Sequence, residues 1–168
     1  SVRVTRRLPS SPIPAPSPPH RDPREQGNAN LLLALSAIPS EPRVGDVLTI
    51  EIVAASSARI VDAPLHVVYD PASLRFLDAA AGDFLSQDGG GLVFIANGHT
   101  RPGDVVIGIG RTNRALGLSG TGRLCRVRFV TLAAGATSIG ISRALAWTDT
   151  GALLPVRLAS LAMQLRSE

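Results

Sequence analysis

The chain has 168 residues, of which 45% are apolar, and this is enough for one domain with a single buried core. Its 13 prolines and 16 glycines argue against long helices. Most of the formal net charge of +4 lies in residues 1–25, where five arginines face two acids; the other residues carry a net charge of +1. No basic face for phosphate is required, so we expect no nucleic-acid partner.

Residues 1–28 are rich in proline, serine and arginine, with a dense run of prolines from Pro9 to Pro19. Such a composition cannot bury enough apolar surface to repay the entropy of ordering. It predicts a disordered linker of extended, polyproline-like character that tethers a domain at residues 29–168 to a domain further upstream. A proline-motif ligand for another protein is the alternative interpretation of this segment.

After residue 28 the apolar residues recur with a period of two, which is typical of half-buried β-strands. In Asp46–Val53, for example, Leu48, Ile50 and Ile52 share one face. Glycine, proline and aspartate turns separate the segments, and no amphipathic helix stands out. The pattern predicts an all-β fold, a jelly-roll β-sandwich of about nine strands. The expected strands are Leu31–Ile38, Asp46–Val53, Leu65–Tyr69, Leu74–Leu77, Gly91–Ala96, Val105–Ile109, Leu124–Thr131, Thr137–Arg143 and Val156–Leu165.

Several glycines occupy informative positions in this pattern. Gly82 and Gly120 are expected at turns that need a positive φ, which glycine adopts without steric cost. Gly108 and Gly110 alternate with the apolar residues of one strand and would leave one face of it nearly bare. A bare, flat sheet face is a place where a partner could approach the backbone.

A set of short motifs, in this order and at this spacing, resembles cohesin domains over roughly residues 30–165. No single motif is decisive, but together they cover nearly everything outside the linker. They are Val44-Gly45-Asp46, the stretch from Ala63 to Pro71 that ends in Tyr-Asp-Pro, Ala81-Gly82-Asp83-Phe84-Leu85, Val106–Gly110, Gly120-Thr121-Gly122, Ala134-Gly135 and Leu154-Pro155-Val156.

The resemblance implies a jelly-roll sandwich and a non-catalytic role in protein–protein interaction. In cohesins the partner is a dockerin, a small calcium-binding helical module that docks on a sheet face including the strand before the Tyr-Asp-Pro turn. The outward positions of that strand here are Asp62, Pro64, His66 and Val68. Dockerin-binding members commonly carry a polar, often acidic residue where this chain has Pro64.

A narrower resemblance is to the cohesin-type domains that follow a proline-rich linker in some bacterial secretin-like proteins of type II secretion. It implies a secretion component as partner instead of a dockerin. Either way we expect the chain in the bacterial cell envelope, periplasm or outer membrane, or outside the cell. The expected partner-binding residues are Asp62, His66, Val68, Gly108, Gly110 and Arg111.

No arrangement of residues predicts an enzyme. His20, His66 and His99 lie far apart, without a second histidine or cysteine at ligand spacing, and no nucleophile elbow is present. Asp83 and Asp88 lie in glycine-rich turns but do not form an EF-hand loop. We therefore expect no catalytic residue, no bound metal and no cofactor.

Carbohydrate binding is the alternative function, because cohesins and polysaccharide-binding modules share the sandwich architecture. A sugar platform generally needs two or three exposed aromatic rings. This chain has one tryptophan, Trp147, in Ala146-Trp147-Thr148-Asp149, and it is the candidate glycan contact. A tryptophan that caps the end of the sandwich is the structural alternative.

Overall fold

The computed structural model describes residues 31–167, so the linker predicted at residues 1–28 lies outside the described residues. The described part is built from strands and one short 3-10 turn, which confirms the all-β prediction. In chain order the elements are β1 (Leu31–Ile38), β2 (Val47–Asp62), β3 (Leu65–Tyr69), β4 (Leu74–Ala81), η3 (Phe84–Ser86), β5 (Leu92–Asn97), β6 (Asp104–Arg111), β7 (Leu118–Thr131), β8 (Gly135–Ala144), β9 (Ala146–Thr148), β10 (Leu153–Leu154), β11 (Val156–Arg157) and β12 (Ser160–Leu165).

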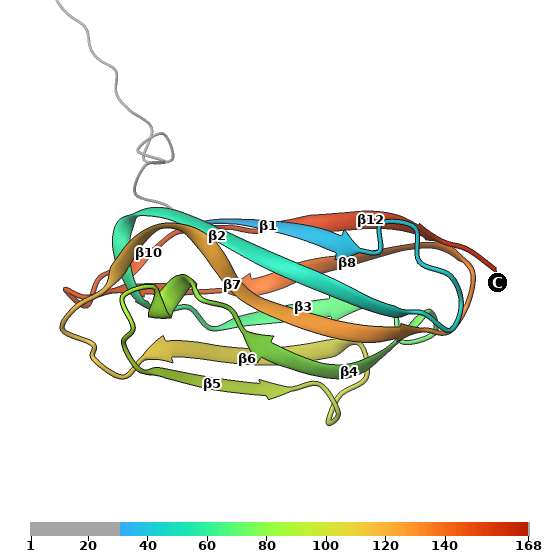
Figure 1. The fold of residues 1–168 in the computed structure, drawn as a ribbon, viewed down its shortest axis with the longest axis horizontal. Coiled ribbons are helices and arrows are strands. Elements are labelled where there is room, and N and C mark those ends of the chain that lie inside the picture. Colours follow the sequence, from blue (N-terminus) through green and yellow to red (C-terminus); the bar gives the residue numbers. More distant parts are fainter. Residues whose placement is uncertain (1–30, 168) are drawn as a thin grey trace, which may run out of the picture.

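The strands form the two layers of a jelly-roll sandwich. One layer has the order β5-β6-β3-β8-β12, and the other contains β4, β7, β2, β1 and β11. The far end of β2 leaves its own layer and pairs with β6 and β9, which joins the two layers into one continuous hydrogen-bonded system. Figure 1 shows β4, β7 and β2 crossing in front of β6 and β3.

The period-two pattern of the sequence places the core between these layers. Leu48, Ile50 and Ile52 are fully buried, as the alternation in β2 predicts. From β7, Phe129 reaches the centre of the core, where its ring lies 4.8 Å from that of Tyr69. Rings at such distances and tilts pack favourably beyond the area they bury.

The expected single strand at Val156–Leu165 is wrong, because the chain changes layers within it. β11 runs parallel to β1, with Leu31 opposite Val156, whereas β12 runs antiparallel to β8, with Ser160 opposite Gly140. The crossing at residues 158–159 interrupts the ladder. This division and the short strands β9 and β10 raise the total from about nine to twelve among the described residues.

The segment around Gly82 also differs from the prediction. Phe84 and Leu85 are fully buried in η3 and close one end of the sandwich. Gly82 does not have a positive φ; it is required because a Cβ there would collide with the backbone oxygen of Arg123. Gly120 does have a positive φ, 106°, but inside β7 and not in a turn.

No helix within residues 31–167 is long and apolar enough to cross a membrane.

Candidate interaction surface

The outer face of the layer β5-β6-β3-β8 is a flat surface whose composition follows from strand register. Residues that pair across neighbouring strands point to the same side of a sheet. One row of such pairs runs from Asn97 through Val106 and His66 to Arg143, and a second contains Ile95 and Gly108. We call these outward positions the docking face.

Large apolar side chains lie exposed at the centre of the docking face. Ile95 is 64% exposed, and Val93 and Val106 are also exposed. Between them lies Gly108, where an added Cβ would meet no atom within 4 Å. The prediction that Gly108 leaves the outer face of its strand bare is therefore confirmed. The result is a shallow apolar platform with room above its centre.

His66 and Asp104 form the main polar contact of this face. Nδ1 of His66 lies 3.1 Å from Oδ1 of Asp104, on the neighbouring strand. The contact directs the imidazole from β3 toward β6, where Val106 is the residue opposite His66. Val68, two residues further on β3, also points outward, is half-buried and lies opposite Asp104 and Gly140.

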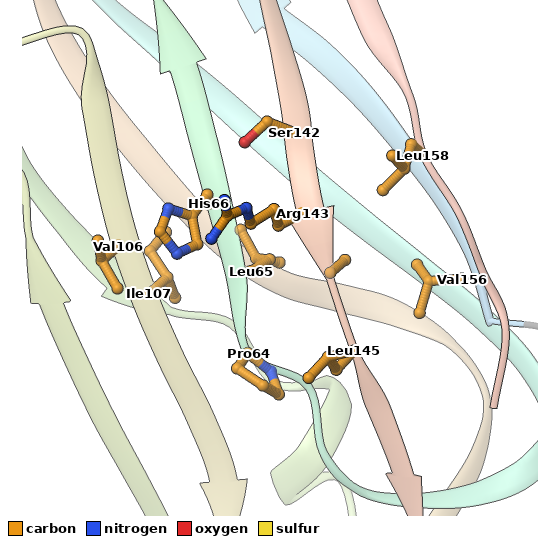
Figure 2. Close-up of a pocket in the computed structure, with 11 residues that line it drawn as sticks. Pro64, Leu65, His66, Val106, Ile107, Ser142, Arg143, Leu145, Val156 and Leu158 are labelled. Carbon is orange, nitrogen blue, oxygen red and sulfur yellow. The ribbon is translucent and has the colours of Figure 1, made fainter. Parts of the chain in front are cut away.

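A groove of about 540 Å³ borders the docking face where β8 separates from the end of the chain. The β8–β12 ladder stops at Gly140 and Ser160, and a bulge in β8 follows, opposite His66. Figure 2 shows His66 and Arg143 on one side of this groove. Its other walls are mainly aliphatic: Pro64, Leu65, Val106, Ile107, Ala144, Leu145, Val156 and Leu158, with Ser142 as a further polar member.

Gly110 is not bare, contrary to the sequence prediction. Oδ1 of Asp62 lies 2.6 Å from the position that a Cβ on Gly110 would take. Asp62 is in turn close to the exposed Arg114, with a distance of 3.3 Å between its Oδ2 and Nη2. The absent side chain thus makes room for the carboxylate of Asp62 and leaves no opening for a partner.

The strand expected at Val105–Ile109 leaves Arg111 outside it, and this boundary is wrong. It is the last residue of β6, and its side chain points inward with only 2% of the residue exposed. The guanidinium donates hydrogen bonds to the backbone oxygens of Leu116 (2.6 Å) and Leu85 (2.8 Å) and to Asp88 (2.8 Å). Arg111 therefore fastens two loops together and does not belong to the docking face.

The Arg111 contact also changes the acidity of its partner. Hydrogen bonds from Arg111 and from the backbone of Gly90 lower the pKa of Asp88 to about 2. The carboxylate is thus held in its charged form at one end of the sandwich. Asp88 acts in this structure as an anchor for its loop.

Trp147 lies on the same sheet surface, at its far end. It pairs with Asp62 across β9 and β2, and it is half-buried. Tyr69, the other large ring with a polar end, packs against Phe129. Among residues 31–167, Trp147 is therefore the candidate ring for a sugar, and it lies on β9, beyond the strands of the docking face.

Within the described part of the chain, no three histidine, cysteine, aspartate or glutamate side chains are grouped so that they could hold a metal ion. The sole cysteine, Cys125, is fully buried in β7, and burial raises the pKa of its thiol to about 12. Such a thiol is not poised to act as a nucleophile.

A scan of protein-family models finds no match for this chain, and a comparison with curated proteins finds none. Solved structures do match. A cohesin module from a Clostridium perfringens family 33 glycoside hydrolase superposes with a TM-score of 0.67 at 15% identity, covering 83% of this chain and 97% of that module. A type I cohesin in complex with its dockerin, from Clostridium thermocellum, gives a TM-score of 0.70 at 10% identity, with coverages of 83% and 96%.

The chain has the cohesin fold. A third similar structure, a non-cellulosomal cohesin from the archaeon Archaeoglobus fulgidus, gives a TM-score of 0.67 at 15% identity and covers 82% of this chain and 91% of its own. The fold implied by the sequence motifs is therefore confirmed. At these sequence identities the likeness establishes the architecture alone.

Proposed function

We propose that the chain is a non-catalytic protein–protein interaction module that docks a dockerin-type partner on the outer face of β5-β6-β3-β8. The observation that carries the proposal is the apolar platform around Gly108. Ile95, Val93 and Val106 are exposed there on two adjacent strands. Contiguous exposed apolar surface on a rigid element is costly in water and marks interaction sites.

The shape of the platform suits a partner with a regular surface. A helix can lie across a flat sheet and press apolar side chains into the space above Gly108, where nothing lies within 4 Å of an added Cβ. The rigid ladders on both sides of β6 keep this surface preorganised, which limits the entropy lost on binding. Other cohesin structures of this fold are complexes with dockerins, which supports a helical protein partner.

Pro64 distinguishes this face from the pattern expected of dockerin-binding cohesins. It stands where a polar residue is common, and it lines the apolar groove beside Leu145 and Leu158. Proline offers neither a charge nor a backbone N–H. We therefore infer that the partner meets apolar surface at this position.

We place the module outside the cell or in the bacterial envelope, because one structure of the same fold is a cohesin domain from the cellulosome of Acetivibrio cellulolyticus. The similar structures lend no support to a secretion component as partner. Polysaccharide is the weaker candidate ligand, since only Trp147 would stack on a sugar.

Affinity capture tests the proposal. The full chain serves as bait for exported proteins of the organism that encodes it, with and without calcium, and the retained proteins are identified by mass spectrometry. Ile95→Asp and Gly108→Arg alter the docking face, whereas Val47→Asp places the same charge on an exposed residue of the other layer. We expect a dockerin-bearing protein with the wild-type and Val47→Asp baits only; identical capture by all four baits would refute the docking face.

A further inference from the structure

We propose that the docking face selects an acidic partner: a helix whose apolar side lies over Ile95 and Gly108 and whose flanking carboxylates contact Arg143 and Arg101. The inference rests on the proposed docking function and adds the charge of the partner to it. Its basis is the distribution of free and engaged charges around His66.

His66 and Val106 form a ridge between two hollows. The groove of about 540 Å³ lies on one side, and Arg143 borders it. A smaller hollow of about 220 Å³ lies on the other side, lined by the same His66 and Val106, by Arg101 and by Asp104. Each hollow at this ridge therefore carries one arginine. Both arginines are exposed.

The acids of this surface are engaged by residues of the chain itself. The side chain of Asp104 is only 16% exposed and lies against Nδ1 of His66. Asp62 is half-buried over Gly110 and faces Arg114. Asp70, next to β3, accepts a hydrogen bond from the backbone N–H of Ala72. The carboxylates of Asp104 and Asp62 are therefore poorly placed to receive a cationic partner.

The two arginines differ from these acids in their contacts. Within residues 31–167, no ion pair joins Arg101 or Arg143 to an acid. Guanidinium groups bind carboxylates in a planar, bidentate geometry and are common in protein interfaces. The available ionic contacts on the docking face are thus cationic, and they flank apolar surface. A complementary helix carries carboxylates beside an apolar stripe.

Two synthetic helical peptides test this complementarity. Both carry the same leucine and alanine stripe, flanked by glutamates in one peptide and by lysines in the other. Their affinities for the full chain are measured by calorimetry, and the contact site is located by backbone amide chemical shifts. We expect the glutamate peptide to bind at least tenfold more tightly at low salt, with shifts in β5, β6, β3 and β8. The difference should shrink at 0.5 M NaCl because exposed charges are then screened.

Charge reversal identifies the residues responsible. Arg143→Glu and Arg101→Glu should each weaken the glutamate peptide about tenfold and strengthen the lysine peptide. Arg126→Glu reverses an exposed charge of the other layer and should change neither affinity. Equal affinities of the two peptides, tighter binding of the lysine peptide, no binding of either, or insensitivity to Arg143→Glu would each overturn the inference.

The captured natural partner separates this inference from the docking proposal. If Ile95→Asp abolishes capture while Arg143→Glu and Arg101→Glu leave it unchanged, the docking face stands and the acidic partner is wrong. If Ile95→Asp has no effect, the docking face itself is wrong. Loss of capture with all three variants, but not with Arg126→Glu, supports both.

Discussion

Oδ1 of Asp62 lies 2.6 Å from the point that a Cβ atom on Gly110 would occupy. The carboxylate therefore fills the space left by the missing side chain, and Arg114 holds it there at 3.3 Å. Gly108, two residues earlier on the same strand and the same face, has nothing above it within 4 Å. Two glycines of one strand thus have different surroundings: one accommodates a carboxylate of the chain, and the other leaves the surface above it open.

This difference predicts opposite responses to the same substitution. Gly108→Ala should raise the free energy of unfolding by about 0.5–1 kcal/mol, because alanine loses less backbone entropy on folding and meets no neighbour here. Gly110→Ala should lower it by about 1 kcal/mol, because the new methyl group displaces Asp62. Urea unfolding measures both values. Equal changes in the two variants would contradict the packing of Asp62 over Gly110.

A second prediction concerns the buried Arg111. Arg111→Met removes the donors to Leu85 and Leu116 and leaves their oxygens without these hydrogen bonds, so the free energy of unfolding should fall by about 2–4 kcal/mol. Arg114→Ala, at an exposed arginine of the loop that follows β6, should cost less than about 1 kcal/mol. Denaturant midpoints compare the two variants. A similar, small loss in both would mean that Arg111 does not fasten the loops.

The Asp88 contact predicts a dependence of stability on pH. Its pKa is about 2 in the folded chain, below the ordinary value of 3.8, so its contribution to stability is complete above pH 3.8 and is lost as pH falls toward about 2. Thermal unfolding of the wild type and Asp88→Asn should therefore differ at pH 6 and converge between pH 4 and pH 2. Asp83→Asn serves as the control. Asp83 lies in the same connection between β4 and β5, and its side chain makes no capping hydrogen bond. A constant difference across this range would contradict the assignment.

The fold was predictable because a half-buried strand produces an alternating pattern of apolar residues in the sequence. The alternation of Leu48, Ile50 and Ile52 is local, and the structure buries all three. The short strands β9 and β10 escape such reasoning, since two or three residues carry no period, and they form only by pairing with each other and with β2. The break between β11 and β12 depends on pairing with strands far away in the chain.

The candidate interaction surface was predictable only in part. Outward positions on β3, such as His66, follow from alternation alone, but their contacts depend on which strand lies beside them. Arg111 continues the inward series of Ile107 and Ile109, so period two extended by one residue places it inside. The expected strand, Val105–Ile109, ended two residues too early to include it. The sequence does not predict that Arg143 lies beside His66, because this position arises from a bulge in β8.

Trp147 allows the carbohydrate alternative to be tested directly, because it is the chain's single tryptophan. One half-buried ring is a poor platform for a sugar, so cello- and arabino-oligosaccharides at millimolar concentration should leave its fluorescence spectrum unchanged. Trp147→Phe should also leave protein capture intact, since Trp147 lies beyond Asp62, away from Ile95. A saturable spectral shift with sugar would instead favour polysaccharide binding.

Cys125 provides a probe of the intact sandwich. The thiol lies in the core between the layers, and burial raises its pKa to about 12, so almost no thiolate exists at pH 8. A disulfide reagent at pH 8 should therefore label the native chain only at the rate of unfolding, and urea should accelerate labelling in step with the loss of β-structure. Ser142→Cys combined with Cys125→Ala moves the thiol to an exposed position of β8 and should react at once. Rapid labelling of native wild-type chain would show that the two layers separate far more readily than a core of this kind permits.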